Sequence, residues 1–125
     1  MIKYEALLEE HGESLKRLDE ALREQKTGFT RDSAIKRFEL AFDLAWKSIK
    51  TFLEARGISC NSPISCFREA YREGVIGLED VWIDMVKTRN KTAYVYNEIL
   101  AEETFGELPR ILEALNQLLS KLREN

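Results

Sequence analysis

The sequence has little of the material from which metal centres and disulfide frameworks are built. Among its 125 residues there is one histidine, His11, and there are two cysteines, Cys60 and Cys66, in the segment CNSPISC. The spacing of these cysteines matches neither the Cys-x-x-Cys redox motif nor a zinc ligand pair, so no metal site is expected. We expect two reduced, partly buried thiols, because cytosolic conditions keep cysteines reduced.

The chain also lacks long apolar runs and a strong excess of basic charge. No apolar segment approaches the roughly 20 residues that a membrane span needs, and the start, MIKYEALLEEHGE, is charged throughout, unlike a secretory signal. The 19 basic and 22 acidic residues give a net charge of −3. This balance argues against a broadly basic nucleic-acid surface, although a local basic patch remains compatible with it. We therefore predict a cytoplasmic protein that does not contact a membrane.

Apolar periodicity predicts an all-α protein. The sequence is 44% hydrophobic and 33% charged, which is typical of a helix-rich globular domain, and no segment alternates with the period of two that marks a strand. We expect a single domain over residues 1–125, an antiparallel up-and-down bundle of four main helices and a short one. The predicted helices cover residues 3–25, 31–56 and 63–73, a stretch that begins near Leu78, and a C-terminal stretch after Asn97 that Gly106 and Pro109 interrupt. Ser62, followed by Pro63, is the expected N-cap of the third helix, and Asn97 is the expected cap of the last. The expected inner face of the fourth helix is Leu78, Trp82, Met85 and Val86.

The segment from Arg31 to Arg56 is the central helix of this prediction. Thr30 is a candidate N-cap before it, and Gly57 follows it as a stop. Its main apolar stripe leaves a second, narrower patch, Leu40 and Leu44, nearly opposite. A helix that is apolar on two sides is either central in its own bundle or shared with a second subunit. We therefore regard Leu40 and Leu44 as a candidate dimer or partner interface.

Arg89 is the most informative polar residue, because it falls on the apolar stripe of the fourth helix, seven residues after Trp82. An arginine there is costly unless its guanidinium meets an anion, a carboxylate or carbonyl groups. Either Arg89 belongs to a binding site, or it fastens the helix end to an acidic neighbour. Asn90 and Thr92 can let the helix unwind, which would allow Arg89 and Tyr94 to converge.

His11 lies on the apolar seam of the first helix. We expect a half-buried, hydrogen-bonded side chain rather than a catalytic one, because no acidic or nucleophilic partner is evident for it. A catalytic role would require His11 to reach across from the first helix.

Several segments together resemble the nucleotidyltransferase substrate-binding protein family of the HEPN-domain superfamily. They are RFELAFDLAWKSIKTFL, FREAYREGVI, VWIDMVKTRNKTAYVY and the interrupted C-terminal helix. The resemblance implies a HEPN-like helical bundle that forms a homodimer, with a minimal nucleotidyltransferase, encoded nearby, as its partner. Mg²⁺ and ATP would belong to that partner, so no cofactor is expected in this chain. Many such pairs resemble toxin–antitoxin modules.

Active HEPN ribonucleases carry the motif Arg-x-x-x-x-His-x-Tyr, which the resemblance places on this chain. Arg89 takes the arginine position and Asn90 follows it, Tyr94 stands at the histidine position, and Tyr96 takes the tyrosine position. A phenol has an ordinary pKa of about 10 against about 6.5 for imidazole, so it is a poor proton acceptor at neutral pH. Because loss of a general base typically costs ~10²–10⁴ in rate, we expect a weak or inert nuclease.

Three functional hypotheses follow. The first is a non-catalytic or weakly catalytic partner subunit that presents to the nucleotidyltransferase either a substrate or its own Tyr96, since the motif tyrosine accepts AMP in related pairs. The second is a metal-independent ribonuclease toxin that uses Arg89, with Asn90 and Tyr94, in a cleft between two protomers, and it alone would require RNA. The third is a helical adaptor without nucleotide chemistry. The missing histidine favours the first hypothesis over the second, and Arg89 on an apolar stripe argues against the third.

Overall fold

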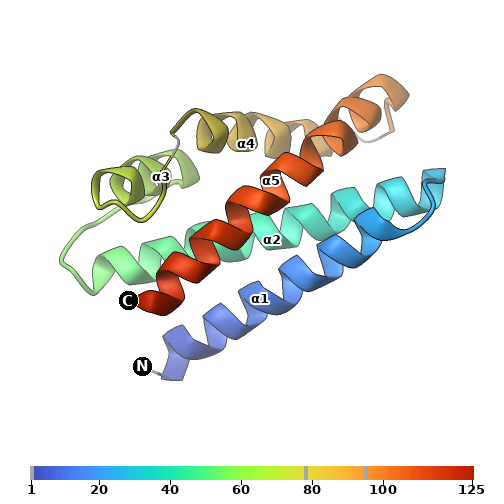
Figure 1. Ribbon diagram of the computed structural model, residues 1–125. Coiled ribbons are helices and arrows are strands. Elements are labelled where there is room, and N and C mark those ends of the chain that lie inside the picture. Colours follow the sequence, from blue (N-terminus) through green and yellow to red (C-terminus); the bar gives the residue numbers. More distant parts are fainter. Residues whose placement is uncertain (1, 78, 95) are drawn as a thin grey trace.

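The computed structural model describes residues 2–77, 79–94 and 96–125, and it is almost entirely helical (Figure 1). The elements are α1 (Ile2–Arg23), α2 (Gly28–Glu54), α3 (Pro63–Arg72), α4 (Glu79–Lys91), the 3₁₀ turn η1 (Thr92–Tyr94) and α5 (Glu98–Glu124). No strand occurs in these described ranges, and the predicted all-α fold class is confirmed. Leu78, expected on the inner face of the fourth helix, lies outside the described residues.

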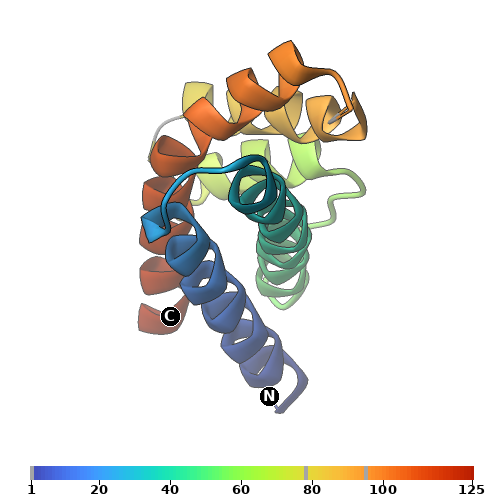
Figure 2. The ribbon, with the colours of Figure 1, turned by 90° about the vertical axis from the view of Figure 1, so that its right-hand side faces the viewer.

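The long helix α2 occupies the centre of the bundle. It packs against α1, α3, α4, η1 and α5. The helix α1 runs antiparallel to α2, α5 crosses α2, and the two chain ends lie at the same end of the bundle (Figure 1). The helices α3 and α4 lie together on the far side of α2 from α1 (Figure 2). The apolar patches on two sides of α2 are therefore explained in part by its central place within one chain.

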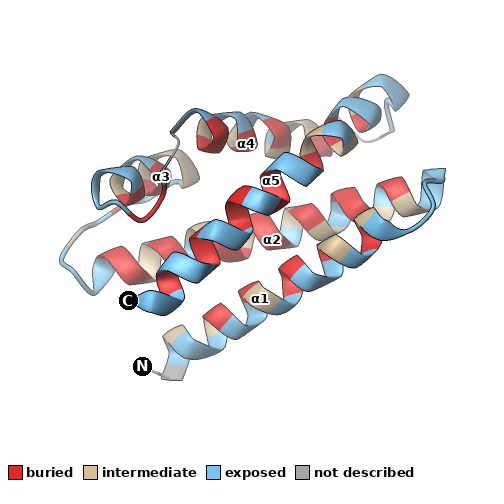
Figure 3. Ribbon diagram, in the orientation of Figure 1, coloured by how far each residue is buried: buried red, intermediate tan, exposed pale blue. Residues whose placement is uncertain are grey.

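The core forms where the apolar stripes of these helices face one another. Buried residues follow the inner faces of α1, α2 and α5 (Figure 3). Aromatic rings connect the layers: Phe42 of α2 meets Phe67 of α3 with centroids 5.8 Å apart, and Phe67 meets Trp82 of α4 at 4.9 Å. Trp82 and Met85 are buried as the sequence predicts. Within the described residues, no helix is long and apolar enough to cross a bilayer.

The start of α2 differs from the prediction. The helix begins at Gly28, and its N-cap is Thr27 rather than Thr30. Thr30 N donates to Thr27 Oγ1 at 3.1 Å, and Thr27 N donates to Thr30 Oγ1 at 2.7 Å, so Thr30 completes a reciprocal capping box. Both threonines have the side chain that an N-cap needs, and sequence alone does not decide between them. Gly57, at φ 76°, ends the helical region as expected.

Gly106 and Pro109 both lie inside α5, which is continuous, so the predicted interruption of the C-terminal helix is wrong. A proline in a helix removes one backbone hydrogen bond and crowds the carbonyl four residues earlier, which bends the helix or ends it. Here Leu108, Ile111 and Leu112 are all buried in the core, and this packing keeps the chain helical through the proline. Figure 2 shows α5 changing direction where the orange half meets the red half.

The two cysteines form a disulfide, so the prediction of reduced thiols is wrong. The chain after α2 turns back at Ser62, which caps α3 as predicted, with Pro63 as the first helical residue. This turn brings the Cα atoms of Cys60 and Cys66 to within 5.0 Å, and both side chains are buried. The spacing of the cysteines does not reveal this turn, which depends on how α3 packs.

Candidate functional site

Arg89 extends from the last turn of α4 toward α2. Its Nη1 lies 3.2 Å from Glu39 Oε2, and its Nη2 lies 3.8 Å from Asp43 Oδ2. Nη1 also donates to Thr92 Oγ1 at 2.9 Å. The side chain of Arg89 is 29% exposed, so it is neither sealed in the core nor free in solvent. Of the two alternatives that the sequence leaves open, fastening to acidic neighbours is the one seen, and it takes place at the edge of a cleft.

The cleft has a volume of about 420 Å³ and lies between α1, α2 and α4. Its lining is mostly charged: Ser14, Arg17, Lys36, Arg37, Glu39, Leu40, Asp43 and Arg89. Four of these side chains are cationic and two are anionic, which leaves a local positive excess on a chain of net negative charge. Such an excess attracts anions such as phosphate groups or carboxylates.

Leu40 and Leu44, the predicted interface pair, lie in different environments. Leu40 lines the cleft and is 54% exposed. Leu44, one helical turn later, is buried within the single chain. Of the pair, Leu40 is therefore the residue available to a second molecule.

The other motif residues lie outside this cleft. Asn90, Tyr94 and Tyr96 are at least partly exposed, and the cleft is lined by other side chains. The rings of Tyr94 and Tyr96 meet edge to face, with centroids 6.3 Å apart. The two tyrosines therefore contact each other, whereas Arg89 contacts α2 and Thr92.

Tyr96 precedes the cap of α5. Asn97 accepts hydrogen bonds through Oδ1 from Ile99 N at 3.0 Å and Leu100 N at 3.1 Å, which confirms the predicted cap. Asn97 N donates to Tyr94 O at 2.9 Å and closes the turn. On this turn Tyr96 is 81% exposed, so its hydroxyl is open to a partner.

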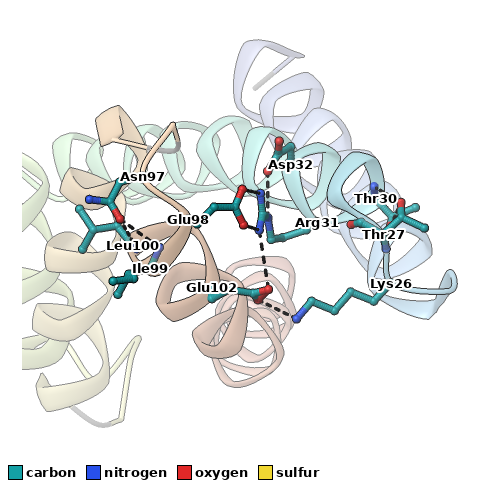
Figure 4. A network of polar contacts seen from close by, with 10 residues as sticks. All are labelled: Lys26, Thr27, Thr30, Arg31, Asp32, Asn97, Glu98, Ile99, Leu100 and Glu102. Atoms are coloured by element: carbon teal, nitrogen blue, oxygen red, sulfur yellow. Dashed lines mark hydrogen bonds and ion pairs between the residues drawn. The ribbon is translucent and has the colours of Figure 1, made fainter.

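A second polar cluster, which the sequence analysis did not identify, lies next to this turn (Figure 4). Arg31, almost fully buried at the start of α2, donates through Nη1 and Nη2 to the two carboxylate oxygens of Glu98 at 2.7 and 3.0 Å. Its Nε donates to Asp32 at 3.0 Å, and Lys26 pairs with Glu102 beside it at 2.6 Å. The hydrogen bonds from Arg31 lower the pKa of the Glu98 carboxyl.

A signal for Arg31 exists in the sequence. It stands four residues before Ile35 and seven before Phe38, on the main apolar stripe of α2. This is the same kind of anomaly that singles out Arg89 on the fourth helix.

His11 is fully buried, and neither of its ring nitrogens has a hydrogen-bond partner among the described residues. The prediction of a half-buried, hydrogen-bonded histidine is therefore wrong, because the position of His11 on the seam of α1 places the whole ring in the interior of the bundle. Burial, with a smaller contribution from the charge of Arg123, lowers the pKa of His11 to about 4. His11 also lies outside the lining of the cleft.

The described residues do not gather the ligands of a metal ion. No group of three or more His, Cys, Asp or Glu side chains suited to a metal occurs among residues 2–77, 79–94 and 96–125. Glu39 and Asp43, the two carboxylates of the cleft, face the guanidinium of Arg89. The arrangement suits an anionic ligand or an acidic partner group better than a cation.

One comparison with known proteins shows the family of this chain, and two show its fold. Residues 7–124 match the profile of the family described as nucleotidyltransferase substrate binding protein like. A crystal structure of a protein from Thermus thermophilus is similar to this chain at TM-score 0.86 and 32% identity, over 90% of this chain and 98% of that one. A Haemophilus influenzae structure, described as revealing the fold of a substrate binding domain of a nucleotidyltransferase, is similar at TM-score 0.73 and 22% identity, over 96% of each chain. No curated protein matches.

Proposed function

The chain belongs to the nucleotidyltransferase substrate binding protein like family, and from this premise we propose that it is a partner subunit of a minimal nucleotidyltransferase. The family match over residues 7–124 carries the proposal. The partner would supply Mg²⁺, ATP and the catalytic carboxylates. The two proteins would act in the cytoplasm as a pair like those of toxin–antitoxin modules.

The contacts of the motif residues favour a partner role over a ribonuclease. The guanidinium of Arg89 is engaged by Glu39 and Asp43, whereas a nuclease would need it for the charge on a phosphate. Tyr94, at the position of the motif histidine, lies outside the cleft. His11, the single histidine, is buried and has a lowered pKa. Among the residues that line the cleft, no imidazole accompanies Arg89 as a general base for neutral pH.

Tyr96 is the proposed acceptor of a nucleotidyl group. Its phenol oxygen would attack the α-phosphorus of ATP bound by the partner, the bond from that phosphorus to the bridging oxygen of the β-phosphate would break, and pyrophosphate would leave. The phenol proton would pass to a carboxylate of the partner or to water. The exposure of Tyr96, 81%, supports this role, because an acceptor must enter the active site of another protein.

The exposed face around Leu40 supports a homodimer as part of the same proposal. Leu40 is 54% exposed beside the cleft, where a second copy would cover an apolar side chain that is now open to water. In such a dimer the cleft would lie at or near the interface between the two subunits.

Co-purification tests the partner role. Co-expression with the nucleotidyltransferase encoded nearby should give a complex that elutes as one peak and contains both chains. Two separate peaks at micromolar concentrations would contradict the proposal. Expression of this chain alone should leave growth unchanged. Slower growth that Arg89→Ala relieves would favour the ribonuclease instead.

Intact mass spectrometry tests the acceptor role. With the partner and Mg²⁺-ATP, the mass of this chain should rise by one adenylyl group, and Tyr96→Phe should abolish the rise. A mass increase that survives Tyr96→Phe would reject Tyr96 as the acceptor. Tyr94→Phe is the matched control, because Tyr94 is exposed on the same turn.

A further inference from the structure

The turn that carries Tyr96 is tied to α2 on both sides by ion pairs of opposite polarity. Before the turn, the cationic Arg89 of α4 meets the anionic Glu39 of α2. After the turn, the anionic Glu98 of α5 meets the cationic Arg31 of α2 (Figure 4). One helix thus holds both ends of the turn, and the position of the turn relative to the bundle is set by side chains of α2.

We propose that the Arg31–Glu98 pair positions Tyr96 for nucleotidyl transfer. This inference rests on the proposed function, in which Tyr96 attacks the α-phosphorus of ATP held by the partner and pyrophosphate leaves. Glu98 and Arg31 are positioning residues, because they act through the backbone of the turn and take no part in the transfer of the proton.

The geometry of the pair suits this task. Two parallel hydrogen bonds, at 2.7 and 3.0 Å, fix the orientation of a carboxylate as well as its distance. Arg31 is almost fully buried and is also held by Asp32, so it offers a rigid support. Glu98 is the first residue of α5 and lies only two residues after Tyr96, so little chain separates the support from the phenol.

The side chain of Tyr96 itself makes few contacts that would fix its orientation. It is 81% exposed, and within the described part of the chain its ring contact is with Tyr94, which is itself exposed. The direction of the phenol therefore depends on the backbone of the turn, which Asn97 caps and Glu98 anchors. Loss of the anchor should misplace the phenol while the distant core stays unchanged.

Glu98→Ala is the test variant, because the side chain of Glu98 is 77% exposed and its truncation opens no cavity, while Arg31 keeps Asp32 and Glu102 as ion-pair partners. The matched control is Glu107→Ala, which removes a partly exposed carboxylate and its ion pair with Arg110, at 3.3 Å, from the same helix. Each variant is mixed with the purified nucleotidyltransferase and Mg²⁺-ATP. The rate of the adenylyl mass increase and the modified tyrosine, found by peptide mapping, are measured beside the thermal midpoint.

Misplacement of a reacting group by about 1 Å can cost ~10²-fold in rate, so we expect Glu98→Ala to slow modification of Tyr96 by about tenfold or more. The KM for ATP should not change, because the partner binds the ATP. Part of the modification should move to Tyr94. Glu98→Asp, which keeps the charge on a shorter side chain, should recover part of the rate, and Glu107→Ala should behave as wild type.

The outcomes separate this inference from the function on which it rests. If Glu98→Ala and Glu107→Ala are modified on Tyr96 alone at the wild-type rate, the positioning role is wrong and the acceptor role stands. If the wild-type chain is never modified, both are wrong. If Glu98→Ala lowers the thermal midpoint, Glu98→Gln, which keeps the size of the side chain, replaces it as the test variant. Its modification rate and its modified tyrosine are then compared with those of wild type in the same way.

Discussion

The apolar core and the charged end of this molecule are held by different interactions. In the core, buried side chains such as Leu18, Phe38 and Leu115 pack between α1, α2 and α5. At the charged end, around the turn from α4 to α5, ion pairs such as Arg31–Glu98 join the elements beside the packed side chains. Stabilisation in the core scales with the apolar area removed from water. Ion pairs between exposed side chains contribute little to stability, whereas a two-point pair such as Arg31–Glu98 fixes the orientation of its carboxylate.

This contrast assigns different tasks to the two regions. The core sets whether the chain folds, and it tolerates no loss of volume without a cost in stability. The charged end sets where Arg89 and Tyr96 lie relative to α2. Variants in the two regions should therefore separate stability from function, and the largest losses of stability should come from the core.

Phe38→Ala should give the largest effect. Phe38 is fully buried and packs edge to face against Phe42, so truncation leaves a cavity and should lower the free energy of unfolding by about 3–5 kcal/mol. Urea denaturation followed by circular dichroism measures this change. Phe29→Ala is the matched control on the same helix, because Phe29 is 91% exposed and should change stability by less than about 0.5 kcal/mol. Similar losses in both variants would contradict the assignment of the core.

The stability of the protein should depend on pH through His11. This side chain is buried in the apolar region, and its ring nitrogens have no hydrogen-bond partner among the described residues. Its pKa is about 4 in the folded chain and about 6.5 when unfolded. At a pH between these two pKa values, His11 is protonated in the unfolded chain and neutral in the folded chain. The contribution of His11 should therefore be complete above a pH of about 6.5, and stability should fall by about 3 kcal/mol as the pH drops to about 4.

His11→Leu isolates this contribution. The variant removes the titrating group and two unpaired nitrogens, so its stability should be at least that of wild type at neutral pH, and the loss of stability in acid should shrink by about 3 kcal/mol. Carboxylates of the charged end still lose their pairing in acid, so a residual slope is expected. An unchanged slope in His11→Leu would mean that His11 takes up its proton in the folded chain.

The two regions also differ in how far the sequence predicts them. Apolar periodicity and the caps Ser62 and Asn97 gave the order of the helices and the buried faces, because these signals are local. Thr27 in place of Thr30, the continuous helix through Pro109 and the disulfide were missed. Each of these depends on tertiary packing, which decides between local alternatives of similar energy.

Of the two arginines that anchor the turn, the sequence pointed to Arg89 alone. Arg89 was recognisable as a candidate site residue because a cation on an apolar stripe needs a partner. Its partners, however, lie on another helix, and no local sequence pattern identifies them. Arg31 carried the same signal and was overlooked, and its partner Glu98 is 67 residues away. Pairing over such distances is set by the crossing of helices, which a single sequence does not display.

A double-mutant cycle on Arg89 and Glu39 measures the strength of the anchor before the turn. Both side chains are partly buried, at 3.2 Å, so the coupling energy in Arg89→Gln and Glu39→Gln should be about 0.5–1 kcal/mol. It should weaken in about 1 M salt, where charges are screened within about 3 Å. A coupling as large as the effect expected for Phe38→Ala would erase the distinction between the two regions, and a coupling of zero would mean that the pair does not anchor the turn.

The smallest effect is expected from Leu40, and it sharpens the comparison because Leu44 lies one turn away on the same helix. Leu44→Ala should cost about 2 kcal/mol, since Leu44 is buried within the chain. Leu40→Ala should cost less than about 0.5 kcal/mol in dilute solution, because Leu40 is largely exposed in the monomer.

If the proposed homodimer covers Leu40, the cost must grow with protein concentration, because association stabilises the folded state by mass action. Thermal midpoints of both variants, measured over a roughly hundredfold range that starts at a low micromolar concentration, report this growth. A cost for Leu40→Ala that stays small over the whole range would place the dimer interface elsewhere.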